Sequence, residues 1–228
     1  LDTVKKKNKI KTDSGLTVEN LKDIIIKFKK MIKNNLGEEF PDSCETQLWG
    51  AVAAVFKSWN GTRAIQYRKI ENIPNHWGTA VNIQSMVFGN LGHSSGTGVA
   101  FTRNPSNGEN NLYGEWLENA QGEDVVAGIR TPHPINEFSK TTQTKNSNTL
   151  IDTFPAVYRQ LIKIKKILEM HYKDMQDIEF TIEANKLWML QTRKGKRTGE
   201  AAIKIGVDMH KEKIISDTTL IKRITTKN

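Results

Sequence analysis

The sequence predicts an α+β fold in which a mainly antiparallel sheet is flanked by helices. Apolar residues recur at helical spacing in two stretches, residues 21–32 and 157–172. Polar and apolar residues alternate over residues 177–183, which is the pattern of a half-buried strand, and a second strand-like run follows at 187–193. The short connection between these two runs predicts a hairpin, and hairpins join antiparallel strands.

Two helices are expected before the sheet. The first is indicated by an apolar stripe formed by Leu21, Ile24, Ile25, Phe28, Met31 and Ile32. Thr17 is suited to cap the start of this helix, and Gly37 is suited to end it. The second helix carries a stripe formed by Leu48, Val52, Val55, Phe56 and Trp59, and it is expected to continue through residues 63–70. Both stripes are predicted to lie in the core, because such stripes are usually buried.

Three strands are expected in the middle of the chain, bounded by Gly-rich and Asn-rich turns. They are assigned to residues 78–89, 99–103 and 113–120. Residues 138–149 are rich in Ser, Thr, Asn and Gln, which predicts a loop or an insertion. A long amphipathic helix is predicted around residues 157–172, with Pro155 near its first turn. Residues 199–228 are predicted to form two short helices.

The composition is that of an ordinary soluble protein, with 37% hydrophobic and 26% charged residues and a mean hydropathy of −0.54. The 228 residues suit one large domain or two small ones. No apolar run approaches the roughly 20 residues of a membrane helix, so no membrane association is expected. The first residues contain no targeting segment, and we expect a cut end there. Cys44 is the sole cysteine, which fits a reducing, cytoplasmic compartment.

The formal net charge of +9 is compatible with nucleotides, nucleic acid or acidic surfaces as partners. The lysines are spread along the chain, however. The basic runs at residues 5–11 and 163–166 are not interleaved with the aromatic residues that single-stranded nucleic acid would need. A solvated, lysine-rich surface is therefore favoured, and no nucleic-acid partner is expected. The remote alternative from another functional class is a non-catalytic basic module that binds nucleic acid.

The predicted hairpin is the strongest candidate for a functional site. Asp177 and Glu179 share one face of the first strand, because successive side chains point to opposite faces. A three-residue loop would place Glu179 opposite Gln191 and would also set Asp177 against Arg193. A two-residue loop would instead place Glu179 opposite Leu190, so both registers stay open. The first register would gather groups that can hold Mg²⁺ and a polyphosphate, whereas a surface salt-bridge ladder is the purely structural alternative.

Two further motifs could contact a nucleotide. The Gly-rich turn over residues 89–98 contains Gly96, Thr97 and Gly98, and such a turn can cradle a phosphate with backbone N–H groups and a hydroxyl. Gly-rich turns between strands are also common where no ligand binds. The acidic pair that begins at Glu123 could hydrogen bond a ribose, orient a basic residue or simply form a polar turn.

Four strings of this sequence resemble the pyruvate, phosphate dikinase family, and the resemblance extends over about residues 17–225. The strings are GTGVAFTRNP at 96–105, NAQGEDVVAGIRTP at 119–132, DIEFTIE at 177–183 and LQTRKGKRT at 190–198. The resemblance implies a partial ATP-grasp fold that lacks its N-terminal lobe. Residues 1–40 would end a helical subdomain, residues 41–198 would form the C-terminal ATP-grasp subdomain, and residues 199–228 would form a helical linker toward an absent phosphohistidine domain.

The resemblance also implies an activity. The chain would be the ATP- and Mg²⁺-binding part of a dikinase that transfers phosphoryl groups from ATP to a catalytic histidine and to phosphate. The full-length enzyme would act between pyruvate and phosphoenolpyruvate, release AMP and pyrophosphate, and form a homodimer. The nucleotide domain of a phosphoenolpyruvate synthase or a glucan dikinase is the close alternative. We expect this segment alone to be inactive, because one wall cannot enclose phosphates and exclude water.

Roles in phosphoryl transfer carry over from the family to matching positions of this sequence. Glu179 and Gln191 would bind Mg²⁺. Arg193 and Thr97 would contact the transferred phosphoryl group as catalytic residues. Asp177 would support the nucleotide site beside them.

Roles in nucleotide binding carry over in the same way. Gln84 and Met86 would line the adenine pocket. Gly96 and Gly98 would contact the nucleotide together with Thr97. Glu123 would meet the ribose.

Overall fold

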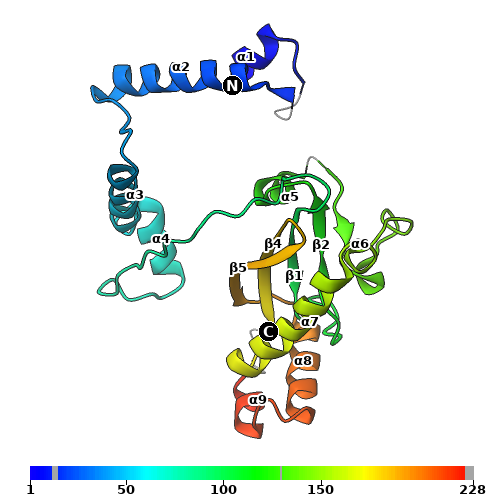
Figure 1. The fold of residues 1–228 in the computed structure, drawn as a ribbon. Coiled ribbons are helices and arrows are strands. Elements are labelled where there is room, and N and C mark those ends of the chain that lie inside the picture. Colours follow the sequence, from blue (N-terminus) through cyan, green and yellow to red (C-terminus); the bar gives the residue numbers. More distant parts are fainter. Residues whose placement is uncertain (12–14, 129, 224–228) are drawn as a thin grey trace. The chain divides into compact units, whose positions relative to one another are not determined.

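The computed structural model describes residues 1–11, 15–128 and 130–223. The chain divides into two compact units, Leu1–Gln84 and Ser85–Asn228, and each is described by itself (Figure 1). The helices between residues 44 and 70 group with the N-terminal helices, and those after residue 198 group with the sheet. The three segments that the family resemblance implied stay a prediction. Within the described ranges, no helix combines the length and the apolar character needed to cross a membrane.

The first unit is helical. Its helices are α1 (Asp2–Lys7), α2 (Val18–Leu36), α3 (Cys44–Ser58) and α4 (Thr62–Ile70). Both expected ends of α2 are confirmed: the Thr17 hydroxyl accepts a hydrogen bond from the Asn20 N–H, and Gly37 ends the helix in the left-handed conformation. The continuation of the second predicted helix is confirmed as well, although residues 59–61 separate α3 from α4.

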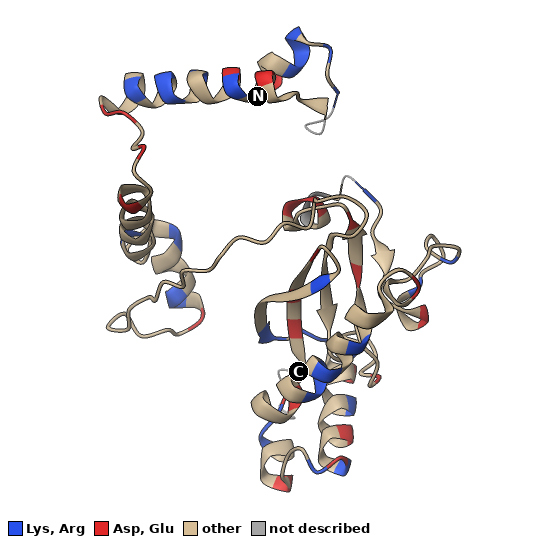
Figure 2. Ribbon diagram, viewed as in Figure 1, with Lys and Arg blue, Asp and Glu red and all other residues tan. Residues whose placement is uncertain are grey.

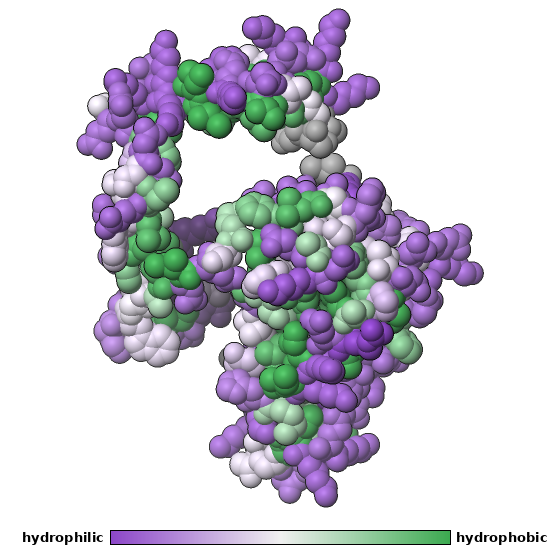
Figure 3. Space-filling model, viewed as in Figure 1, coloured by the Kyte–Doolittle hydropathy of each residue, from purple (hydrophilic) through white to green (hydrophobic). Residues whose placement is uncertain are grey.

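The apolar stripes of α2 and α3 are exposed in this unit, so the prediction that they lie in the core is wrong for this chain. Phe28 is 47% exposed, and Phe56 is 51% exposed. Figure 3 shows apolar surface on these helices. Within the described ranges α2 buries Ile24 alone, and α3 buries no residue. The helices form for local reasons, but no described part of the unit covers their stripes.

The second unit is built on an antiparallel sheet, which confirms the expected α+β class. In the described residues its order is β3-β2-β1-β4-β5. The strands are β1 (Gly96–Phe101), β2 (Tyr113–Glu118), β3 (His133–Pro134), β4 (Gln176–Glu183) and β5 (Lys186–Lys194). β1 pairs with β2 on one side and with β4 on the other, so it is the central strand.

Helix α7 (Pro155–Tyr172) covers one face of this sheet, as Figure 1 shows. Pro155 occupies its first turn, as the sequence predicts. Val157 and Leu161 of α7 are fully buried in one cluster with Ile178 and Phe180 of β4. This apolar contact joins the helix to the sheet and forms the main core of the unit.

Shorter elements complete the second unit. They are α5 (Gly122–Ala127), the 3₁₀ helix η2 (Glu137–Ser139), α6 (Leu150–Thr153), α8 (Gly199–Lys211) and α9 (Asp217–Arg223). The two helices predicted after residue 199 are thereby confirmed, while the predicted residues beyond 223 lie outside the described ranges. Residues 140–148 contain no helix or strand, which agrees with the predicted loop. A second apolar cluster joins Ala201, Ile205 and Met209 of α8 to Met175 and Ile215.

The β4–β5 hairpin reaches its register by an unexpected route. Its loop is a two-residue turn, residues 184–185, in which both residues have positive φ. Such a loop alone would place Glu179 opposite Leu190. The register shifts by one residue between Glu179 and Phe180, so Glu179 pairs with Gln191 and Leu190 is left over as a bulge. Of the two registers that the sequence leaves open, the structure has the one that pairs Glu179 with Gln191, but a bulge and not a three-residue loop produces it.

Two local predictions are corrected by the structure. Residues 77–88 form neither helix nor strand, so the strand expected at 78–89 is wrong. A strand needs a partner for its N–H and C=O groups, and no described strand pairs with this segment. The Gly-rich turn is also shorter than predicted, because β1 already begins at Gly96.

Replacing Leu161 by alanine should lower the free energy of unfolding by about 2–5 kcal/mol, because its fully buried side chain would leave a cavity between α7 and the sheet. Ile167→Ala on the same helix is the matched control. Its side chain is 66% exposed, and the expected loss is below about 1 kcal/mol. Urea unfolding of the chain, followed by circular dichroism, measures both values. Equal losses in the two variants would contradict the packing of α7 on the sheet.

Candidate functional site

The strongest candidate site is the face of the hairpin that points away from α7. Asp177 pairs with Arg193, and Glu179 pairs with Gln191, so the four side chains share this face. We call these four residues the hairpin face. Figure 2 shows the acidic residues of β4 beside the basic residues of β5. The neighbouring residues Ile178 and Phe180 point into the core and hold the face in place.

The charges on the hairpin face are unevenly paired. Arg193 Nε donates a hydrogen bond to Asp177 Oδ2 at 2.7 Å, and this contact raises the pKa of Arg193 above its ordinary value. The distance from Arg193 Nη2 to Glu179 Oε1 is 3.9 Å, which is too long for a hydrogen bond. The side chain of Asp177 is 12% exposed, whereas that of Glu179 is 39% exposed. Asp177 therefore orients Arg193, and Glu179 keeps its carboxylate oxygens available for a ligand.

The donor set of the hairpin face suits magnesium that is shared with a ligand. Glu179 and Gln191 both offer oxygen, which is the ligand atom that Mg²⁺ prefers. In the described residues no group of three or more His, Cys, Asp or Glu side chains could hold a metal ion. A cage made of protein ligands alone is therefore not formed there. Mg²⁺ usually keeps several positions for water and substrate phosphates, so a carboxylate and an amide fit the protein's share.

Thr97 lies on the same face of the sheet, but it is buried. It pairs with Thr181 in the neighbouring strand, in step with the pairing of Val99 with Glu179. The Thr97 hydroxyl donates a hydrogen bond to the Phe180 carbonyl at 3.1 Å, and the residue is 3% exposed. The structure thus brings Thr97 to the right face and already gives its hydroxyl a partner. A role in contacting a phosphoryl group stays a prediction.

Gly96 and Gly98 have a packing role in β1. A Cβ on Gly98 would lie 2.5 Å from Phe180 Cζ, and one on Gly96 would lie 2.7 Å from the Leu117 carbonyl oxygen. Both residues lie in a strand that pairs on two sides, so their backbone N–H groups belong to the sheet and not to a free turn. The structure therefore explains both glycines by close packing, and their contact with a nucleotide stays a prediction.

The remaining predicted residues are exposed. Gln84 ends the first unit, and Met86, at the start of the second, is 71% exposed. Glu123 lies in the first turn of α5, while its neighbour Asp124 accepts a hydrogen bond from the Gln121 N–H. No hydrogen bond or ion pair joins Met86 or Glu123 to the hairpin face in the described part of the chain. Their proposed contacts with adenine and ribose stay predictions.

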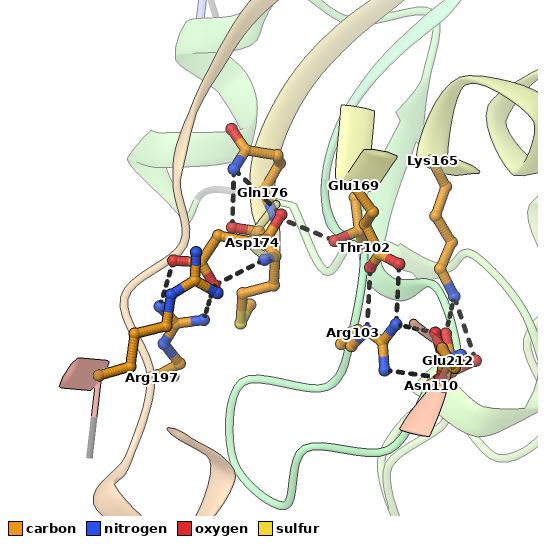
Figure 4. Close-up of polar contacts among 11 residues, drawn as sticks. Thr102, Arg103, Asn110, Lys165, Glu169, Asp174, Gln176, Arg197 and Glu212 are labelled. Carbon is orange, nitrogen blue, oxygen red and sulfur yellow. Dashed lines mark hydrogen bonds and ion pairs between the residues drawn. The ribbon is translucent and has the colours of Figure 1, made fainter. Parts of the chain in front are cut away.

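A buried ionic network next to the sheet was not anticipated from the sequence. Arg103 follows β1 and is fully buried. Its guanidinium donates two hydrogen bonds to the Glu169 carboxylate, at 3.0 and 3.1 Å, and two to the Glu212 carboxylate, at 2.7 and 3.2 Å (Figure 4). Lys165 lies beside this network and donates to the Asn110 carbonyl at 3.1 Å. Burial lowers the pKa of Lys165 below its ordinary value.

One signal in the sequence could have revealed this network. Val157, Leu161, Lys165 and Glu169 follow one another at intervals of four and are all buried on α7. A lysine and a glutamate that continue an apolar stripe indicate buried polar partners elsewhere. Those partners lie far away in the sequence, so the pattern predicts their existence but not their identity.

A second ion pair joins Asp174, just before β4, to Arg197, just after β5. Asp174 is 6% exposed and accepts two hydrogen bonds from Arg197, at 2.6 and 2.7 Å (Figure 4). Burial by itself would raise the pKa of the Asp174 carboxyl. The hydrogen bonds and charge of Arg197, together with the charges of Arg223 and Lys194, outweigh burial and hold that pKa below its ordinary value.

Comparison with known proteins identifies the relatives of this chain. The model of the family "Pyruvate phosphate dikinase, AMP/ATP-binding domain" matches residues 11–159 and 155–214. The chain is 55% identical to pyruvate, phosphate dikinase of Rhizobium meliloti (strain 1021) over 93% of its length, and 51% identical to that of Clostridium symbiosum over 100%. It is also 51% identical to the chloroplastic pyruvate, phosphate dikinase of Flaveria trinervia. The chain spans 23–25% of the length of these relatives.

Asp174→Asn should destabilise the chain near neutral pH by about 2–4 kcal/mol, because Arg197 would lose its carboxylate partner in a partly buried place. The pKa of Asp174 is lower in the folded chain than in the unfolded one. Its stabilising effect is therefore complete above the unfolded pKa and is lost as the pH falls through the folded pKa.

The difference in free energy of unfolding between the wild type and Asp174→Asn should therefore shrink as the solution is acidified below about pH 4. Urea unfolding at a series of pH values measures this difference. Asp208→Asn, which removes a partner of Lys204, is the control. Its free energy of unfolding should fall on acidification as that of the wild type does, because Asp174 is still present. A constant gap between wild type and Asp174→Asn at every pH would contradict the assignment.

Proposed function

The chain belongs to the pyruvate phosphate dikinase AMP/ATP-binding domain family, and we propose that its hairpin face is one wall of a site for ATP and Mg²⁺ in a dikinase. The second unit would be the C-terminal part of an ATP-grasp fold. The observation that carries this proposal is the bulged pairing of β4 and β5, which sets Glu179 beside Gln191 and Asp177 beside Arg193.

Each residue of the hairpin face has a role in this proposal. Glu179 and Gln191 hold Mg²⁺ through oxygen, and the bound ion neutralises charge on the phosphate oxygens of the nucleotide. Arg193 contacts the phosphoryl group in transfer, where its permanent charge offsets the charge that develops. Asp177 positions Arg193 through their 2.7 Å hydrogen bond. Thr97 supplies a hydroxyl from the central strand once the Phe180 carbonyl releases it.

The rest of the nucleotide contacts follow from the family. Gln84 and Met86 line the adenine pocket, Gly96 and Gly98 approach the nucleotide, and Glu123 meets the ribose. The exposure of Met86 and Glu123 supports this proposal, because a ligand can reach both side chains.

The proposed reaction belongs to the full-length protein. ATP donates phosphoryl groups to a catalytic histidine and to phosphate, leaving AMP and pyrophosphate, and the histidine carries its group to pyruvate. The partners are a phosphohistidine domain of the same chain and a second copy in a homodimer, and the compartment is cytoplasmic. A related dikinase such as phosphoenolpyruvate synthase or a glucan dikinase would share this nucleotide site. The acceptor that is phosphorylated distinguishes these enzymes.

Glu179→Gln and Arg193→Met should each lower phosphoryl transfer by about 100-fold or more, because each removes a charge that acts on the transferred group. The measurement uses a chimera in which this chain replaces the matching quarter of the Clostridium symbiosum relative, with AMP formation from ATP as the readout. Glu137→Gln is the matched control, since it makes the same chemical change at an exposed carboxylate on η2. Its rate should stay within about twofold of the unmutated chimera.

Near-normal rates in Glu179→Gln and Arg193→Met would contradict the assigned roles. An effect on the apparent affinity for Mg²⁺ in Glu179→Gln, but not in Arg193→Met, would support the division of roles between metal binding and phosphoryl contact.

The chain by itself should bind Mg-ATP weakly, with a Kd above about 1 mM, and should turn over no ATP. The hairpin face is open to solvent, with 60% of the Arg193 side chain exposed, so water screens its charges and competes for the phosphates. Titration calorimetry of the 228-residue chain with Mg-ATP provides the measurement. Micromolar affinity would show that one wall is sufficient and would overturn this expectation.

A further inference from the structure

A cleft of about 810 Å³ lies in the second unit, between the end of β5 and the helices α8 and α9. The segment after β5 and the start of α8 form one side, and the end of α9 contributes to the other. Gly195, Gly199 and Gly206 are among the residues that line it. The cleft shares no residue with the hairpin face.

The cleft is strongly basic. The ionisable side chains that line it are Lys194, Lys196, Arg197, Lys222, Arg223 and Asp174. Five of these six are cations. The cleft therefore carries a large net positive charge in a concave place, where the field of like charges is focused.

The carboxylate in the cleft is already neutralised. Asp174 accepts both of its short hydrogen bonds from Arg197, at 2.6 and 2.7 Å. Lys194 Nζ and Arg223 Nη1 are each 3.7 Å from its oxygens, which is beyond hydrogen-bond distance. Asp174 and Arg197 thus form a tight pair, and Lys194 makes only a longer ion pair with the same carboxylate.

The lysines are placed to meet a ligand. The side chain of Lys194 is 72% exposed, and Lys196 and Lys222 are exposed as well. Neither Lys196 nor Lys222 forms an ion pair with another described residue. A lysine ammonium is a compact charge with three rotatable donors, which suits the oxygens of a phosphate group.

The lining also limits the kind of anion. The described residues that line the cleft include no Phe, Tyr, Trp or His, so a nucleobase would find no ring among them to stack on. The volume exceeds what a single phosphate fills and lies within the range of small-molecule sites. We infer that the cleft binds a small oligophosphate without a base, of which inorganic pyrophosphate is the simplest example.

Titration calorimetry with inorganic pyrophosphate tests this inference on the whole chain, at low salt and with a chelator to remove divalent metals. The unmutated chain should bind with a Kd of about 1 mM or tighter. The double variant Lys196→Gln/Lys222→Gln should weaken binding about tenfold or more, because each lysine contributes charge-assisted hydrogen bonds. Both side chains are exposed, so the fold should tolerate the change.

Two controls distinguish the cleft from other sources of binding. Lys163→Gln/Lys211→Gln removes the same net charge from exposed positions outside the cleft and should change the Kd by less than about twofold. Arg193→Gln tests the hairpin face, where Arg193 lies, as a competing source of pyrophosphate binding. This result does not depend on the proposed ATP site, whose failure would appear in phosphoryl transfer and not in this titration.

Three results would overturn the inference. The first is no binding of pyrophosphate up to about 10 mM. The second is equal weakening of pyrophosphate binding in the two lysine double variants, which would show that only the net charge of the chain matters. The third is loss of binding in Arg193→Gln with retention in Lys196→Gln/Lys222→Gln, which would place the anion on the hairpin face.

Discussion

A buried guanidinium determines how the second unit is assembled. Arg103 follows the central strand β1 and has no exposed surface. A charge in such a place is stable only when carboxylates and hydrogen bonds surround it. Glu169 of α7 and Glu212 after α8 provide them. One side chain therefore ties the sheet, the helix that covers it and the C-terminal helices together. Glu169 also lies two intervals of four beyond Leu161, so the contact with Arg103 and the apolar packing impose the same rotation on α7.

The two faces of β4 carry out different tasks because a strand alternates its side chains. Ile178 and Phe180 anchor the strand in the core, while Asp177 and Glu179 point the other way. The bulge at Leu190 then decides which residues of β5 they meet. Without this extra residue, a two-residue turn would oppose Glu179 to a leucine. The candidate site therefore depends on a local irregularity of the sheet as much as on its own polar residues.

The ion pairs of the second unit differ in burial: some are enclosed by the protein, and others are exposed and accessible to a ligand. Arg103 is fully enclosed, Asp174 and Arg197 are nearly so, and the Arg193 side chain is 60% exposed. The enclosed charges are satisfied by the protein and stabilise its assembly. The exposed ones, on the hairpin face and in the basic cleft, retain capacity for ligands. This gradient supports both proposals, in which the exposed charges are the ones that contact phosphate.

Local patterns of the sequence predicted much of this protein. The caps of α2, the start of α7 and the two faces of β4 follow from residues within a few positions of one another, because helix and strand geometry act over that distance. The strand expected at 78–89 is absent, and the stripe that includes Phe56 is exposed where burial was expected. A local pattern indicates a preference but cannot supply a partner. The tertiary structure alone decided the bulged register, the need for glycine at position 98 beside Phe180, and the partners of Arg103. Glu169 and Glu212 lie 66 and 109 residues from Arg103, and no spacing rule extends across such separations.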